Sequence, residues 1–133
     1  MTSNSDAVTG TPRLLLRLEG LAVLLVAILL FAQGGASWLL FAVLFFAPDL
    51  SFLGYLAGPR VGAASYNALH TYVGPLLLAG ALILNGSPPA LALIWTAHIG
   101  LDRLLGYGLK YPRGFSETHL GRIGRRARVG LEG

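Results

Sequence analysis

The sequence contains no cysteine and few charged residues, and both absences restrict what the chain can be. Without cysteine it can form neither disulfides nor thiolate metal sites. Charged residues make up 12% of the chain, about half the usual share in soluble domains, whereas hydrophobic residues make up 54%. This composition argues against an ordinary soluble domain and indicates a membrane protein.

Four apolar blocks are each long enough to cross a bilayer, for which about 20 residues are needed. The blocks are residues 14–32, 37–57, 63–84 and 89–109. Short turn-forming connections separate them, with the sequences QGGA, GPRVG and NGSP. We therefore predict an all-α, polytopic membrane protein with four antiparallel transmembrane helices.

The first block has an alternative interpretation as a cleaved signal peptide. Arg13 and Arg17 precede its apolar run, and small residues follow it. Glu19 interrupts the run, however, and no clean cleavage site follows it. These features favour a membrane helix.

Positive charge is confined to one side of the predicted topology. The first and third connections carry no charge, whereas the amino end, the second connection and the tail are basic. Because short cytoplasmic loops collect lysine and arginine, we expect both termini in the cytoplasm, at a bacterial inner membrane. The basic residues are Arg13, Arg17, Arg60, Arg103, Lys110, Arg113, Arg122, Arg125, Arg126 and Arg128.

Composition also divides the chain into three parts. Residues 1–12 are polar and expected to be disordered, residues 13–112 form the transmembrane domain, and residues 113–133 form a basic cytoplasmic tail. In the tail we expect a short helix that begins after Ser116. The tail should bind anionic lipid headgroups and not nucleic acid, although the pI is about 10.0. A second copy of the chain or another membrane protein is the other expected partner.

Ionisable residues inside the blocks converge on one depth. Counted from the cytoplasmic charges, Asp49, His70 and His98 lie roughly 15 to 18 Å deep at about 1.5 Å per residue. Asp102 lies about 6 Å nearer the cytoplasm, and Glu19 is shallower still. Since such groups face a bundle interior or water rather than lipid, we expect them to point inward.

Helical spacing places these residues on two stripes, because residues three or four apart share a face. The stripes are Asn67, His70, Thr71 and Gly74 on the third block, and Trp95, His98, Asp102 and Gly106 on the fourth. In the second block, Pro48 predicts a kink or a new short helix with Asp49 in its first turn.

Several motifs together resemble the small bacterial integral-membrane family catalogued as domain of unknown function 4260. They are APDLS, GYLAGPR, YN-x-x-HTY, AHIGLDR-x-LGYGLKYP and THLGRIGR, and the resemblance covers residues 14–125. It implies a four-helix membrane protein with no assigned activity.

A weaker similarity connects the chain with the bacterial inner-membrane metal-dependent hydrolases. Those proteins have a proline-aspartate motif, a histidine on the next helix and a histidine-x-x-x-aspartate helix in similar order. The similarity implies Asp49, His70, His98 and Asp102 as metal ligands or near ligands. The chain departs from that family at Ser51, which replaces the motif's second aspartate, and lacks its arginine-containing histidine cluster.

Three functions are compatible with these residues. The leading one is a scaffold or accessory protein in which they form a buried polar network, joined by Glu19, Asn67 and Arg103, unless Arg103 reaches the headgroups instead. The second is a metal-dependent hydrolase, because imidazoles and carboxylates suit zinc, manganese or iron. The third is a proton or small-solute pathway. No nucleophile motif or phosphate-binding loop is legible, so enzymatic activity stays open.

Overall fold

The computed structural model describes residues 8–109, 117–118 and 120–122. These residues form mostly helices, and the predicted all-α class is confirmed apart from one minimal hairpin. The elements are α1 (Gly10–Gln33), α2 (Trp38–Leu44), the 3₁₀ helix η1 (Ala47–Ala57), α3 (Pro59–His70), α4 (Val73–Leu84), α5 (Ala90–Leu105), β1 (Glu117–Thr118) and β2 (Gly121–Arg122).

Two helical segments among the described residues are long and apolar enough to cross a membrane. They are α1 and the segment Trp38–Ala57, which α2 and η1 form together, and the bent pair α3 and α4 would make a third. Large apolar side chains cover their outer surfaces, including Leu39 at 73% exposure and Leu84 at 88%. These features indicate a membrane protein.

The second block changes its helix type where proline predicted a break. The α-helical hydrogen bonding of α2 stops at Leu44, and η1 begins at Ala47 with Pro48 in its first positions. Asp49 lies in the first turn of η1, which confirms the prediction for this segment. A proline is tolerated there because the first backbone N–H groups of a helix have no intrahelical acceptor.

The prediction of one continuous helix over residues 63–84 is wrong. Helix α3 ends at His70, α4 begins at Val73, and the two axes are bent by 42°. Pro75 gives the physical reason, because a proline lacks the N–H that would bond the carbonyl of Thr71, and its ring would clash with that carbonyl in a continuous helix. Placed in the first turn of α4, Pro75 fits without this conflict.

Two predicted helix ends and one predicted tail helix also need correction. Helix α1 begins at Gly10, inside the segment expected to be disordered. Helix α5 ends at Leu105 rather than near residue 109, because Gly106 adopts a left-handed φ of 89° that terminates a helix. In the tail, β1 and β2 pair as an antiparallel hairpin where a short helix was expected. Ser116 and most of the basic tail lie outside the described residues.

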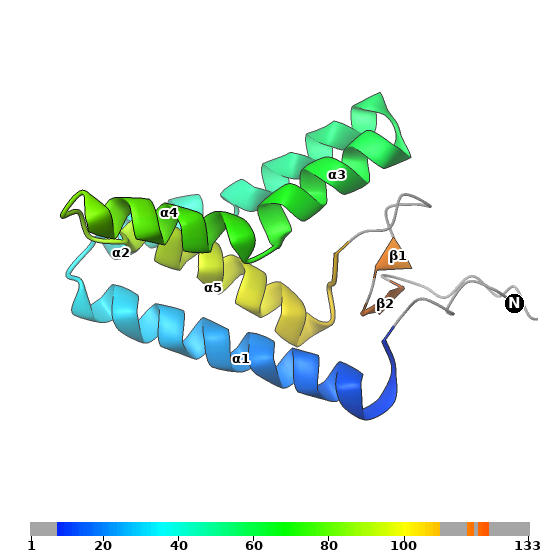
Figure 1. Cartoon of the computed structure of the whole chain (residues 1–133), viewed down its shortest axis with the longest axis horizontal. Coiled ribbons are helices and arrows are strands. Elements are labelled where there is room, and N and C mark those ends of the chain that lie inside the picture. The colour runs from blue at the N-terminus through cyan, green and yellow to red at the C-terminus, as the bar shows by residue number, and fades with distance from the viewer. Residues whose placement is uncertain (1–7, 110–116, 119, 123–133) are drawn as a thin grey trace, which may run out of the picture.

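Figure 1 shows α1 and α5 lying side by side, with α2 and α4 at one end of α5. Helices η1 and α3 run together and diverge from the other helices at the bend between α3 and α4. The α1–α5 contact is very close: a Cβ placed on Gly100 would lie 2.8 Å from the backbone oxygen of Gly20. Glycine therefore lets the two backbones touch.

Candidate metal centre

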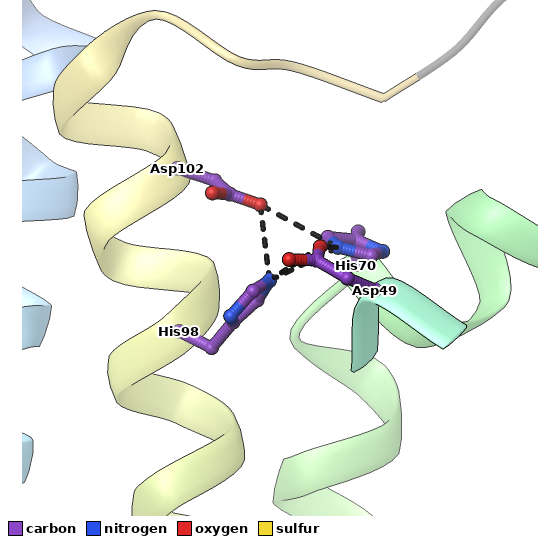
Figure 2. A group of neighbouring side chains, drawn as sticks. All are labelled: Asp49, His70, His98 and Asp102. Atoms are coloured by element: carbon purple, nitrogen blue, oxygen red, sulfur yellow. Dashed lines mark hydrogen bonds and ion pairs between the residues drawn. The ribbon is translucent and has the colours of Figure 1, made fainter. Parts of the chain in front are cut away.

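Four ionisable side chains from three helices meet at one point (Figure 2). Asp49 comes from the first turn of η1, His70 is the last residue of α3, and His98 and Asp102 lie one turn apart on α5. One potential ligand atom from each residue lies within 4.8 Å of the other three. The structure thus brings together Asp49, His70 and His98, which the depth estimate had grouped, and Asp102, which it had placed nearer the cytoplasm.

Five of the six separations between these ligand atoms are similar. The Nε2 atom of His70 lies 3.1 Å from Nε2 of His98, 3.2 Å from Oδ1 of Asp49 and 3.5 Å from Oδ2 of Asp102. The Nε2 atom of His98 lies 3.2 Å and 3.3 Å from the same two carboxylate oxygens. A tetrahedral zinc site with bonds of about 2.0–2.1 Å has ligand atoms about 3.3–3.4 Å apart. Five of the six separations are therefore compatible with such a site, and the sixth, between the two carboxylate oxygens, is within 4.8 Å.

Hydrogen bonding fixes the orientation of the first imidazole. Its Nδ1 atom donates to the backbone oxygen of Tyr66 at 2.9 Å, because a carbonyl can only accept. In the neutral ring, Nε2 then carries a lone pair that points at the oxygens of Asp49 and Asp102. A metal ion between these atoms, or a proton on an imidazole or a carboxylate, makes that arrangement favourable.

Burial strengthens the need for positive charge at this point. The side chain of His70 is fully buried, that of His98 is 3% exposed, and that of Asp102 is 13% exposed. Asp49 is the most accessible of the four, at 36%. Two carboxylates removed from water in this way are costly unless they are paired. One divalent cation would neutralise both.

Aromatic packing supports both histidines. The ring of Tyr66 stacks on His70 with centroids 3.7 Å apart and an interplanar angle of 7°. Phe52 stacks in turn on Tyr66 at 5.2 Å, and Phe45 meets His98 edge-on at 5.3 Å. These contacts restrict the ring orientations, as the surroundings of metal-bound histidines commonly do.

Donors on α5 bind the carbonyls that the break in the third block leaves free. The indole Nε1 of Trp95 donates to the backbone oxygen of Leu69 at 2.6 Å, and Nη2 of Arg103 donates to that of His70 at 2.7 Å. The last carbonyls of a helix have no intrahelical donor, so these bonds hold the end of α3 against α5. They also position His70. This role of Trp95 and Arg103 was not predicted from the sequence, although Pro75 indicates the break that leaves the carbonyls free.

Arg103 does not extend to the headgroups, which corrects one of the two expected placements. It is only 7% exposed, its Nη1 donates to the backbone oxygen of Tyr107 at 3.0 Å, and its guanidinium lies over the ring of Tyr72. No carboxylate lies within ion-pair distance of it among the described residues. The orientation follows from the free carbonyls at the break, which offer acceptors closer than the membrane surface.

The remaining residues of the predicted network lie around the centre. Asn67 is half-buried on α3, three residues before His70. Glu19 is exposed on α1 and is not one of the four grouped residues. On the facing stripes, the ring of Trp95 occupies the space where a Cβ on Gly74 would lie.

Two of the basic residues predicted at the cytoplasmic surface donate hydrogen bonds to backbone carbonyls. The Nε atom of Arg13 donates to Leu120 at 2.6 Å, and that of Arg17 donates to Leu104 at 2.8 Å. Leu104 belongs to the last turn of α5, where a cation interacts favourably with the helix dipole. The Arg17 bond connects the start of α1 to the end of α5, and the Arg13 bond connects it to Leu120, between β1 and β2.

The donor set suits zinc better than manganese. Two imidazole nitrogens and two carboxylate oxygens in tetrahedral arrangement are typical of Zn²⁺, whereas manganese prefers octahedral oxygen sites. The absence of cysteine from the chain leaves nitrogen and oxygen as its available ligands. The residues present therefore fit zinc.

Comparison with known proteins identifies a family but no activity. The sequence model of a family described as "Domain of unknown function (DUF4260)" matches residues 13–123. No curated protein and no solved structure matches the chain. The similarity to metal-dependent hydrolases is not shown by these comparisons.

Proposed function

We propose that this chain, which belongs to the DUF4260 family, is a small integral membrane protein that binds Zn²⁺ through Asp49, His70, His98 and Asp102. The family description assigns no activity, so the proposal rests on geometry. Its main support is that five separations among the four ligand atoms fall between 3.1 and 3.5 Å. These separations place all four potential ligand atoms around one point, where a single cation can contact each of them.

We assign the metal a structural role in a membrane scaffold or accessory protein. Four protein ligands complete a tetrahedral shell, whereas catalytic zinc sites keep one position for water or substrate. The ligands come from η1, α3 and α5. A bound ion would therefore tie the start of η1 and the end of α3 to α5.

The test is the metal content of protein purified in an uncharged detergent without chelators and then supplied with one equivalent of Zn²⁺. We expect one zinc per chain in the wild type and at least a 100-fold weaker affinity in His70→Ala and His98→Ala, because each removes a ligand. Asp102→Asn should be weakened similarly. Glu19→Gln is the matched control, since it neutralises an exposed carboxylate outside the group. Equal zinc binding by wild type and His98→Ala would overturn the proposal.

A metal-dependent hydrolase is the second candidate, and the exposure of Asp49 is the observation in its favour. At 36% exposure this carboxylate is the ligand most open to exchange with water. Water in its place would become a nucleophile with a pKa of about 7. Zinc-loaded protein that cleaves chromogenic phosphoesters or amides, and loses this activity in His98→Ala, would favour the enzyme. Full zinc occupancy without turnover favours the structural centre.

We further propose four membrane spans with both termini in the cytoplasm of a bacterial inner membrane. The separation of basic from uncharged connections supports this orientation. Helix α5 has 16 residues, about 24 Å at the usual rise, so residues 106–109 would complete the fourth crossing. A reporter active only in the periplasm should be silent when fused after Gly133 and active when inserted at Gly86. The reverse pattern would overturn the orientation.

A further inference from the structure

The backbone of Tyr107, two residues beyond the end of α5, is connected to two of the four proposed ligand residues. Its N–H donates to the backbone oxygen of Asp102 at 2.7 Å. Its carbonyl accepts from Nη1 of Arg103 at 3.0 Å, and Nη2 of the same guanidinium donates to the backbone oxygen of His70 at 2.7 Å. One ligand residue of α5 therefore holds Tyr107 directly, and one ligand residue of α3 holds it through Arg103.

The guanidinium of Arg103 makes the bonds to His70 and Tyr107 depend on each other. A guanidinium is planar and rigid, so two carbonyls that accept from Nη1 and Nη2 together fix its orientation. The side chain is buried, and these two carbonyls are its hydrogen-bond acceptors among the described residues. If His70 moves away from α5, Arg103 loses one acceptor and with it the orientation in which it holds Tyr107.

The C-terminal hairpin β1–β2 is attached at this same end of α5. The Nε atom of Arg13 on α1 donates to the backbone oxygen of Leu120, which lies between the two strands and is fully buried. The same guanidinium also lies against the end of α5, because a Cβ on Gly106 would be 2.7 Å from its Nη2. Figure 1 shows the hairpin near the start of α1. Contacts therefore lead from the ligand residues through Arg103, Tyr107, Gly106 and Arg13 to the hairpin.

We propose that the metal centre and the hairpin regulate each other: zinc on the four ligands favours docking of the hairpin at Arg13, and the docked hairpin strengthens zinc binding. The inference rests on the proposed metal function. Without a cation, the buried carboxylates of Asp49 and Asp102 repel each other, so η1 and α3 are held less firmly to α5. Arg103 then loses the carbonyl of His70, and the path of the chain after α5 is no longer fixed. Because linkage is reciprocal, zinc and docking strengthen each other by the same factor.

Hydrogen exchange at the amide of Tyr107 measures this coupling, and the end of α4 supplies a matched control. There the N–H of Ser87 donates to the backbone oxygen of Leu82 at 2.9 Å, in the same helix-ending pattern as the bond from Tyr107 to Asp102. The end of α4 contains none of the proposed ligands. Full-length protein in detergent is compared with one equivalent of Zn²⁺ and with excess chelator. We expect zinc to slow exchange at Tyr107 at least tenfold and to leave exchange at Ser87 unchanged.

Two variants test the path in its two directions. Arg103→Lys keeps the charge, but one ammonium cannot hold two carbonyls in the fixed geometry of a guanidinium. With one zinc per chain, which also reports that the variant is folded, exchange at Tyr107 in Arg103→Lys should no longer respond to the metal. Leu120→Ala removes part of the docked contact and should weaken zinc binding at least threefold. Leu105→Ala is its matched control, because this leucine of α5 is 52% exposed, and it should bind zinc as the wild type does.

Three results would overturn the coupling, and each differs from failure of the metal centre. Equal slowing at Tyr107 and Ser87, or no slowing at either, would show that zinc does not act specifically on the end of α5. A response of Tyr107 that persists in Arg103→Lys would show that Arg103 does not transmit it. Equal zinc affinities of Leu120→Ala and the wild type would separate the hairpin from the centre. A wild type that binds no zinc would instead contradict the proposed function, and the coupling with it.

Discussion

Helix α5 makes two contacts of opposite chemical character. Toward α1 it presents Gly100, and the backbones touch at Gly20 with no side chain between them. Toward η1 and α3 it presents His98 and Asp102, which meet Asp49 and His70. The first contact depends on shape and dispersion alone. The second depends on balancing buried charges, so its strength is set by the cation that occupies it.

Removing the cation should therefore weaken the contact of α5 with η1 and α3 most, and it should lower the stability of the fold. If free Zn²⁺ exceeds its dissociation constant about 1,000-fold, binding stabilises the fold by about 4 kcal/mol. We expect excess chelator to lower the thermal midpoint by roughly 10 °C in detergent, measured by circular dichroism. Asp102→Asn, with an affinity at least 100-fold weaker, should show at most about a third of this stabilisation, whereas Glu19→Gln should respond as the wild type does. A chelator-insensitive wild type would mean that protons, not metal, balance the carboxylates.

Replacing Gly100 with a larger residue should break the contact between α1 and α5 without changing any of the four proposed metal ligands. In Gly100→Leu, the new Cβ would lie 2.9 Å from the backbone nitrogen of Leu24, and backbone cannot move aside as a side chain can. We expect a loss of about 3 kcal/mol, measured by thermal unfolding with zinc present. Gly80→Leu is the control, because nothing lies within 4 Å of a Cβ at that position. Equal midpoints for the two variants would show that α1 and α5 do not touch here.

The smallest expected effect concerns the hydrogen bond by which Trp95 of α5 holds the end of α3. Trp95→Phe removes the hydrogen bond to Leu69 and leaves a carbonyl without its partner. We expect a loss of about 1–2 kcal/mol and faster amide exchange around Tyr72. Trp38→Phe is the matched control, because Trp38 is 52% exposed and packs on Phe31 and Phe41. The same loss in both variants would contradict the role assigned to Trp95.

Three of the four site residues could be grouped by depth from the sequence because helix geometry is regular. A constant rise per residue turns distance along the chain into depth, and this placed Asp49, His70 and His98 together. The start of η1 was equally predictable, since Pro48 has a local steric effect. Pro75 has the same effect in the third block. The apolar run around it concealed the break, and with it the need for carbonyl donors from Trp95 and Arg103.

The partners of α5 could not be predicted in the same way. Several blocks contain glycine, so composition does not reveal that Gly20 and Gly100 are the pair in contact. The expected membership of Glu19 in the polar network rested on depth alone. Helix α1 instead turns Gly20 toward α5 and leaves Glu19 exposed. Depth is a one-dimensional quantity, whereas a contact also requires the rotation of each helix about its axis.

The sequence by itself determined the helical, apolar class of the protein and the break at Pro48, because hydropathy and proline sterics act locally along the chain. Only the tertiary structure decided that two histidines and two aspartates converge within 4.8 Å. It also decided that α5 carries both the glycine contact and the polar centre. Such arrangements depend on how separate helices pack, and no local pattern encodes the relative rotation of two helices.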